Sequence, residues 1–182
     1  MIIGVTGNYC SGKDAVAAIL QGKNFYHVSF SDLLRNELTT RKQKITRDKL
    51  IELGNHLRTK QGASVLSKLA LQEIKDGENH VFTSIRNPSE VEHLTQREDF
   101  ILVNVTAPES VRLKRIIQRN REEDPKTLKE LREKESIENS NDSNSQQLQR
   151  VIDMAKITIV NDSTLEKLTE KVHKLVRDQL YK

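Results

Sequence analysis

Apolar residues in this chain gather in five short runs, with longer amphipathic stretches between them. The runs span residues 1–5, 25–30, 81–85, 100–105 and 157–160. Each run is almost continuously apolar, which is typical of parallel strands buried on both faces. Between the runs, apolar residues recur every three or four positions, as they do in amphipathic helices. The pattern predicts an α/β protein in which helices cover a five-stranded parallel sheet.

Polar residues mark where the predicted helices begin. Start signals stand at 31–32, 46, 87–90, 108, 124–125 and 163–166. The signal at 87–90 places a proline at the first helical position, and 163–166 has the spacing of a capping box. The polar segment 138–145 lacks apolar periodicity and is predicted to be a mobile linker inside a single domain that spans residues 1–182.

The segment after the first apolar run has the spacing of a phosphate-binding loop. It consists of Gly7, Asn8, Tyr9, Cys10, Ser11, Gly12, Lys13 and Asp14. Such a loop wraps a phosphate with successive backbone N–H groups, and its glycines permit the close approach. The preceding strand and the following helix are the context that the motif requires. The sequence therefore predicts that the loop binds a nucleoside triphosphate, with Lys13 on the outer phosphates.

Asp14 stands where a serine or threonine normally places a hydroxyl on magnesium. A carboxylate is also a hard oxygen ligand, so we expect Asp14 to serve Mg²⁺ directly or through water. The alternative is that tight magnesium binding has been lost. Cys10 lies near a helix N-terminus, which can lower a thiol pKa, but we interpret it as a tolerated small residue.

Composition narrows the classes of function. The chain has 182 residues, of which 31% are charged, and a single cysteine. It is long enough for one domain with a sizeable core, and one cysteine excludes an internal disulfide and fits a cytoplasmic, reducing compartment. No apolar run approaches a membrane span, and the first run enters the phosphate loop instead of forming a signal peptide. The net charge of +4 comes without an aromatic and basic stripe, so nucleic acid is not the expected substrate.

Arginines on a predicted helix form a second group with chemical meaning. Arg115 and Arg119 lie four residues apart, hence on one helix face, and Arg121 follows. Phosphoryl transfer requires cations over the transferring group, because charge spreads over its oxygens. The segment around 119–145 is therefore predicted to be a lid that closes over the nucleotide. The competing interpretation is a solvated, charged helix face.

A third group follows strands two and three, where a second substrate could lie. It consists of Asp32, Arg35, Arg47, Arg58 and Arg86. Arg35 and Arg58 could clamp an acceptor phosphate through paired N–H donors, and Arg86 follows a strand end that faces the ligand crevice. Surface charge and helix capping are the alternatives, and they are favoured for Arg47.

Gly54 and the five histidines are the remaining residues with a predicted role. A glycine within a helix costs roughly 1 kcal/mol relative to alanine, so Gly54 predicts close packing or ligand approach between Arg47 and Arg58. The five histidines show no metal-ligand spacing and are predicted to be packing or surface residues.

The chain resembles the P-loop nucleotide kinases, in the group of nucleoside monophosphate kinases and dephospho-CoA kinases. The resemblance rests on the phosphate loop and on the segments 1–7, 84–88, 115–121 and 160–165. Segments 31–35, 53–58 and 146–148 resemble more closely the small kinase-like domains found alone or fused to deoxycytidylate deaminases.

The resemblance implies a three-layer α/β/α P-loop NTPase fold, with an acceptor-binding helical region at about 31–76 and the lid at about 119–145. It implies ATP and Mg²⁺ as cofactors, with Lys13 on the donor phosphates and Asn161 near the donor base. Arg115, Arg119 and Arg121 would lie near the transferring phosphoryl group. The acceptor would be held by Asp32, Arg35, Arg58 and Arg86.

The chain departs from this pattern at two further places. Thr83 stands where relatives often carry an acidic residue, and we hypothesise that Asp14 compensates for it across the site. Segment 29–32 keeps one acid where dephospho-CoA kinases usually have an Asp-Ala-Asp cluster.

The sequence favours ATP-dependent phosphoryl transfer to a small phosphorylated acceptor, above all a nucleoside or deoxynucleoside monophosphate. Dephospho-CoA is the alternative acceptor. A non-catalytic nucleotide sensor that regulates a partner such as a deaminase is the alternative class. No membrane partner is expected, and a homodimer stays open.

Overall fold

A central parallel sheet organises the computed structural model, which describes residues 1–120 and 124–180. Its strands are β1 (Ile2–Thr6), β2 (Phe25–Ser29), β3 (Asn79–Thr83), β4 (Phe100–Thr106) and β5 (Ile157–Val160). They lie in the order β2-β3-β1-β4-β5, and every pairing is parallel. The predicted five-stranded parallel sheet is confirmed. Because β1 is central, the loop that leaves it lies in the middle of the sheet's carboxyl edge, where ligands bind in such folds.

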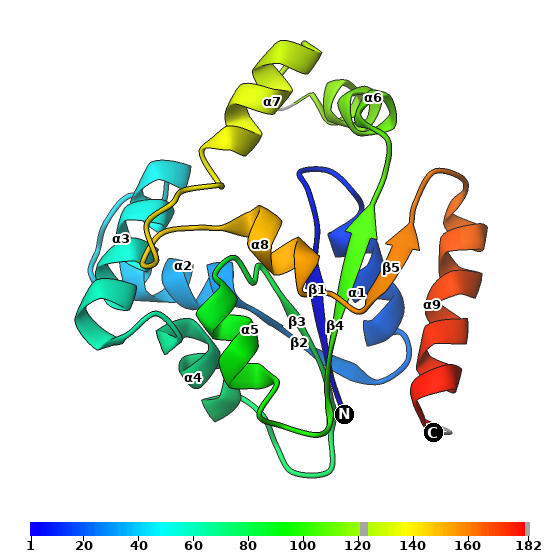
Figure 1. Cartoon of the computed structure of the whole chain (residues 1–182), viewed down its shortest axis with the longest axis horizontal. Coiled ribbons are helices and arrows are strands. Elements are labelled where there is room, and N and C mark those ends of the chain that lie inside the picture. Colours follow the sequence, from blue (N-terminus) through cyan, green and yellow to red (C-terminus); the bar gives the residue numbers. More distant parts are fainter. Residues whose placement is uncertain (121–123, 181–182) are drawn as a thin grey trace.

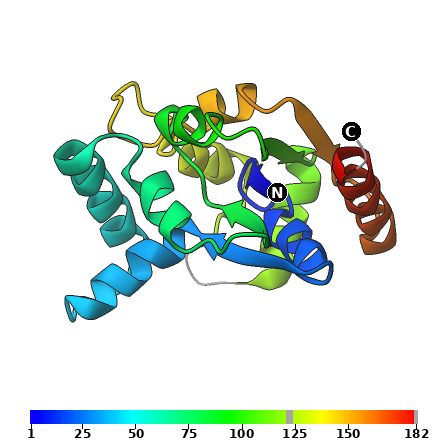
Figure 2. The same cartoon turned by 90° about the horizontal axis from the view of Figure 1, so that it is seen from below.

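Helices cover both faces of the sheet (Figures 1 and 2). Two separate apolar clusters are buried between the sheet and these helices. On one face, Ile3 and Val5 pack against α1 (Lys13–Gln21) and α9 (Leu165–Leu180). The other face packs against α2 (Phe30–Thr40), α3 (Arg47–Gln61), α4 (Val65–Gln72), α5 (Pro88–Leu94) and α8 (Leu148–Asp153). The three-layer α/β/α arrangement is the one predicted.

The remaining helices lie beyond the carboxyl ends of the strands. They are α6 (Glu109–Arg119) and α7 (Leu128–Ser136), which Figure 1 shows above β1 and β4. They belong to the region expected to form a lid. In the described part of the chain, no helix is both long and apolar enough to cross a membrane.

Several boundaries differ from the sequence prediction for local reasons. Strand β3 ends at Thr83 instead of residue 85, because Ser84 adopts φ 63° and breaks the extended backbone. Helix α7 begins at Leu128 with Thr127 as its cap, not at residues 124–125. At the start of α9 the Thr164 hydroxyl accepts from the Lys167 N–H, so the cap lies one residue beyond the predicted Ser163. Helix α8 was not predicted, because six residues are too few to show a period.

The start signal predicted for α5 is confirmed, whereas the cap predicted at residues 31–32 is wrong. At α5 the Asn87 side chain accepts from the Ser89 N–H, while Glu90 accepts from the Asn87 N–H, with Pro88 at the first helical position. Helix α2 begins at Phe30 and has no side-chain cap, so Asp32 lies in its first turn instead of capping it. There it pairs with Arg35 at 2.6 Å.

Candidate nucleotide and acceptor site

The phosphate loop connects β1 to α1 in a conformation that depends on its glycines. Gly7 has φ 138° and Gly12 has φ 106°, both in the region that L-residues rarely adopt. A Cβ on Gly7 would lie 2.1 Å from the Val105 carbonyl oxygen. Helix α1 has no side chain capping its N-terminus. The N–H groups of its first turn are therefore available to an anion.

The Lys13 side chain folds back onto the phosphate loop. Its Nζ donates to the carbonyl oxygens of Gly7 and Asn8, both at 2.8 Å. Desolvation, and after it the neighbouring Arg86 cation, lowers the pKa of Lys13 to about 8. The Lys13 ammonium is thus charged at neutral pH, although its environment disfavours the charged form. A phosphate ligand would stabilise that charge.

Asn161, which follows β5, and Arg115 of α6 hold the loop through its backbone. The Asn161 Nδ2 donates to the Ser11 carbonyl oxygen at 2.9 Å, and Asn161 is 7% exposed. Arg115 donates to the carbonyl oxygen of Asn161 at 3.0 Å and to that of Ser11 at 3.4 Å. Sequence reasoning assigned Asn161 to the donor base and Arg115 to the transferring group. In the structure both residues contact the loop backbone.

Tyr9 links the loop through its side chain to the region predicted to be a lid. Its hydroxyl donates to Asp124 Oδ1 at 2.9 Å, and Arg119 lies over its ring with Cζ 4.8 Å from the centroid. Arg119 also donates to both Asp124 oxygens, at 2.6 and 2.7 Å. This pairing with Arg119 lowers the pKa of Asp124 to about 2, and burial raises that of Tyr9. The predicted lid residue Arg119 therefore lies beside the loop, whereas Arg121 falls outside the described residues.

A second connection between lid and loop was missed from the sequence. Arg112 is 2% exposed and donates to the carbonyl oxygens of Ala107 and Tyr9, both at 3.1 Å. It also pairs with Glu135 of α7, which accepts from the Tyr9 N–H at 3.2 Å. Apolar spacing gives no signal for such a pair, because Arg112 appears in the sequence as one basic residue among nine between positions 112 and 134.

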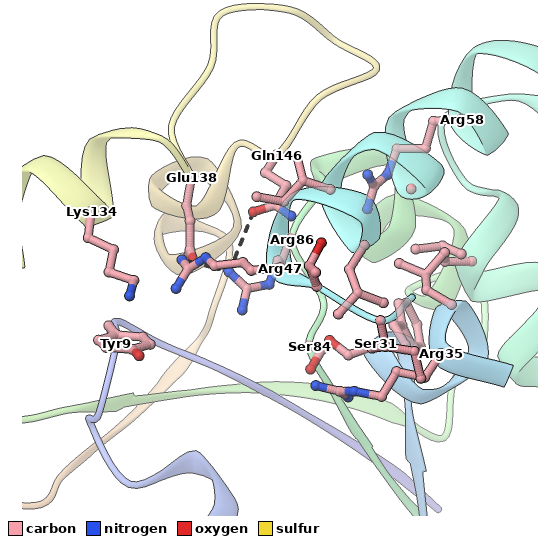
Figure 3. A pocket seen from close by; sticks show the side chains of 18 of the residues that line it. Tyr9, Ser31, Arg35, Arg47, Arg58, Ser84, Arg86, Lys134, Glu138 and Gln146 are labelled. Carbon is pink, nitrogen blue, oxygen red and sulfur yellow. Dashed lines mark hydrogen bonds and ion pairs between the residues drawn. The ribbon is translucent and has the colours of Figure 1, made fainter. Parts of the chain in front are cut away.

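A cavity of about 560 Å³ opens next to Tyr9, between the lid, α2 and α3 (Figure 3). Its wall combines apolar side chains with five cations and two carboxylates. The charged residues are Arg35, Arg47, Arg58, Arg86, Lys134, Asp124 and Glu138. The structure thus brings the predicted acceptor arginines together at one cavity, and Arg47 belongs to the same group.

Arg58 lines this cavity but is mostly engaged elsewhere. It is 2% exposed and donates from Nε and Nη2 to Glu90 Oε1, at 3.0 and 2.7 Å. A Cβ on Gly54 would lie 3.2 Å from the Arg58 Nη1 and 3.4 Å from Leu34. The glycine predicted to mark close packing therefore leaves room for this guanidinium.

Arg86 and Arg47 meet at a buried carboxylate that sequence reasoning placed in a mobile linker. Both arginines pair with Glu138, which is 3% exposed. The segment that follows is anchored instead of loose: the Asn87 side chain donates to the carbonyl oxygens of Ser143 and Ser145, at 2.7 and 2.9 Å. Partners so far apart in the sequence leave no local signal.

Asp14, which is expected to serve magnesium, and Thr83, for which it is expected to compensate, lie apart from this group. Asp14 is exposed in the first turn of α1. Thr83 is 5% exposed and its hydroxyl lies 2.8 Å from the His27 Nε2. Across the described ranges, no three His, Cys, Asp or Glu side chains are grouped to hold a metal ion. Burial raises the pKa of Cys10, so its position near the helix does not activate it.

Comparison with known proteins assigns the class. The profile of the AAA_18 family, described as an AAA domain, matches residues 3–138, and the chain belongs to this family. A UPF0200 protein of Sulfurisphaera tokodaii is 28% identical over 178 residues, covering 97% of this chain and 96% of its own. UPF0200 protein TK1334 of Thermococcus kodakarensis is 28% identical over 189 residues, covering 100% of both chains.

Solved structures share the fold over nearly the whole chain. TT1252 from Thermus thermophilus superposes with a TM-score of 0.62 at 19% identity, covering 98% of this chain and 97% of its own. A shikimate kinase from Aquifex aeolicus has a TM-score of 0.57 at 17% identity, covering 100% and 99%. A dephospho-CoA kinase from Campylobacter jejuni has a TM-score of 0.51 at 13% identity, covering 98% and 96%. The chain therefore has the P-loop kinase fold. The link to deaminase-fused domains stays a prediction.

Proposed function

We propose that this protein transfers a phosphoryl group from ATP to a small phosphorylated acceptor, in the first place a nucleoside or deoxynucleoside monophosphate. One observation carries the proposal: Tyr9 belongs to the phosphate loop and also lines the cationic cavity, so the donor and acceptor sites adjoin. The kinase names of the structures with the same fold support transfer over binding alone.

The residues divide by role. Lys13 and the loop N–H groups hold the donor phosphates, and Arg119 approaches from the lid. Arg35 and Arg86 hold the acceptor, with Arg47 beside them. Catalysis would consist of in-line positioning and neutralisation of charge. Arg58 acts mainly through Glu90, which fixes the backbone after β3 by accepting from the Arg86 N–H at 3.0 Å.

Asp14 would contribute to a magnesium site formed with the donor phosphates. Magnesium typically binds one or two carboxylates together with phosphate oxygens and water, so a single exposed carboxylate next to the loop fits this ion. Magnesium would neutralise charge on the phosphates. Replacing Asp14 with serine should change the magnesium concentration that gives half-maximal rate; an unchanged requirement and turnover would contradict this role.

An acceptor screen tests the proposal. ADP formation is followed with ATP, magnesium and each nucleoside monophosphate, deoxynucleoside monophosphate or dephospho-CoA in turn, with Lys13→Ala as the control. Acceptor-dependent ADP that is absent from the control supports a kinase and names its substrate. Turnover with dephospho-CoA alone would favour that alternative acceptor.

The departures at Asp14 and Thr83 favour a second candidate, a nucleotide sensor that regulates a partner. Saturable ATP binding without turnover on any acceptor would support the sensor and overturn the kinase.

A further inference from the structure

Glu138 is a buried carboxylate on the lid side of the acceptor cavity, and the roles above leave it unused. Its backbone is fixed at two points: its N–H donates to the Glu135 carbonyl oxygen at 3.1 Å, and its carbonyl oxygen accepts from the Leu148 N–H at 2.9 Å. Asn139 next to it forms a bridge with Gln147. The side chain is thus presented from a constrained backbone, between α7 and α8.

The two oxygens of this carboxylate bind different arginines. Oε1 accepts from Arg47 at the start of α3, and Oε2 pairs with Arg86 in the connection after β3. Gln146 also approaches Arg86, at 3.5 Å (dashed in Figure 3). Burial by itself would raise the pKa of Glu138. The Arg86 cation outweighs this effect together with Arg47 and Lys13, so the pKa of Glu138 lies below its usual value. The carboxylate is therefore ionised at neutral pH.

Exposure distinguishes the carboxylate from its partners. The side chain of Glu138 is 4% exposed, whereas those of Arg47 and Arg86 are 30% and 24% exposed. A carboxylate that filled the position of the acceptor phosphate would face the open cavity and would itself be exposed. Instead the two cations are exposed, and the anion that holds them is covered.

We propose that Glu138 is a positioning residue that joins Arg47 and Arg86 into one clamp for the acceptor's phosphate. The inference rests on the proposed function and adds a residue to it. Two guanidinium groups repel each other, and a shared carboxylate offsets that repulsion while it fixes their orientation. Because Glu138 follows α7, the clamp also ties the end of α7 to α3 and to the connection after β3.

This role differs from that of a general base. A carboxylate whose pKa is lowered by two arginines is a weak proton acceptor. Its removal should therefore impair acceptor binding more than turnover. A carboxylate that merely competed with the acceptor phosphate would have the opposite effect, because its removal would tighten binding.

The test compares Glu138→Gln with Glu138→Asp in steady-state kinetics on the acceptor found by the screen. The glutamine keeps the size and removes the charge, so KM for the acceptor should rise at least about tenfold, with KM for ATP within about twofold. Aspartate keeps the charge and should recover part of the loss. The matched control is Glu133→Gln on α7, whose carboxylate is 64% exposed and 3.9 Å from Lys129. It should behave as the wild type.

A second readout does not depend on turnover. In ¹⁵N-labelled protein without ligand, the Arg47 and Arg86 Nε–H signals should shift in Glu138→Gln and stay in place in Glu133→Gln. An unchanged or lowered acceptor KM in Glu138→Gln would overturn the clamp while the kinase stands. A wild-type protein that transfers to no acceptor would instead overturn the proposed function.

Discussion

The phosphate loop and the cationic cavity adjoin, but they are built in different ways. The loop is eight consecutive residues whose shape depends on two glycines with positive φ and on backbone N–H groups. The cavity depends on ion pairs between distant segments, such as Arg47 with Glu138, 91 residues apart, and Arg58 with Glu90, 32 apart. The shape of the loop is therefore encoded within a few residues, whereas the cavity exists only after the chain has folded.

The largest expected effect separates two arginines of the same cavity. Arg58→Ala leaves Glu90 buried without its cation and should lower the free energy of unfolding by about 3–5 kcal/mol. Arg35→Ala removes an exposed pair, with side chains 46% and 58% exposed, and should cost less than about 1 kcal/mol. Urea unfolding measures both. Equal losses would show that the cavity is not held by its buried pair.

The next effect tests the backbone nature of the loop. Gly12→Ala forces an L-residue into φ 106° and places a Cβ 2.1 Å from the Asn161 Nδ2. The strain should lower stability by about 1–3 kcal/mol and weaken ATP binding. In the double variant with Asn161→Ala, the stability lost to the clash with Asn161 should be recovered. The stability lost to the positive φ of residue 12 should not. A Gly12→Ala protein that binds ATP as the wild type does would contradict the description of the loop.

A smaller effect concerns the pH dependence of ATP binding. With its pKa lowered to about 8, Lys13 loses its charge in the unliganded protein as pH rises above that value. A bound anion favours the charged form, so binding takes up a proton and the ATP Kd should rise about tenfold between pH 7 and 9. Calorimetry in buffers of different ionisation enthalpy measures the uptake. Lys13→Arg stays charged and should lack this slope; the same slope in both proteins would exclude Lys13 as its source.

An effect of similar size lies at the contact between α6 and Asp124, beside Tyr9 of the loop. Asp124→Asn weakens the pairing with Arg119 and should cost about 1.5 kcal/mol at neutral pH. Because the pKa of Asp124 is lowered to about 2 in the folded protein, its stabilisation is present above about pH 4 and is lost as pH falls toward 2. Unfolding of both proteins between pH 2 and 7 should therefore converge at the acid end. A constant difference over that range would assign the effect to another contact.

The sequence was sufficient for the features that repeat or lie together. Continuous apolar runs identified all five strands, and the glycines and Lys13 identified the loop, because each signal lies within a few residues. The start of α5 was predicted for the same reason, because Asn87, Pro88 and Glu90 lie within four residues, although the capping box that Asn87 and Glu90 form there was not predicted.

The features that the sequence did not reveal are pairings. Glu138 lies in a segment of asparagine, serine and aspartate, which is typical of a mobile loop, and its burial depends on arginines from two other elements. Arg58 has the spacing of a ligand-binding arginine, but its partner Glu90 is visible only in three dimensions. From sequence alone, a charged residue is predicted to be exposed to solvent, because its oppositely charged partner cannot be identified.

Glu90 restricts which parts of the cavity wall can move. Its two oxygens accept four N–H groups, from the Arg58 Nε and Nη2 and from the backbones of Arg86 and Asn87, and the residue is 0% exposed. Helix α3 and the connection from β3 to α5 are thus fastened to each other at the back of the cavity. They form its fixed wall, so any opening movement must be made by the opposite wall or by the exposed connection between α2 and α3 at residues 41–46.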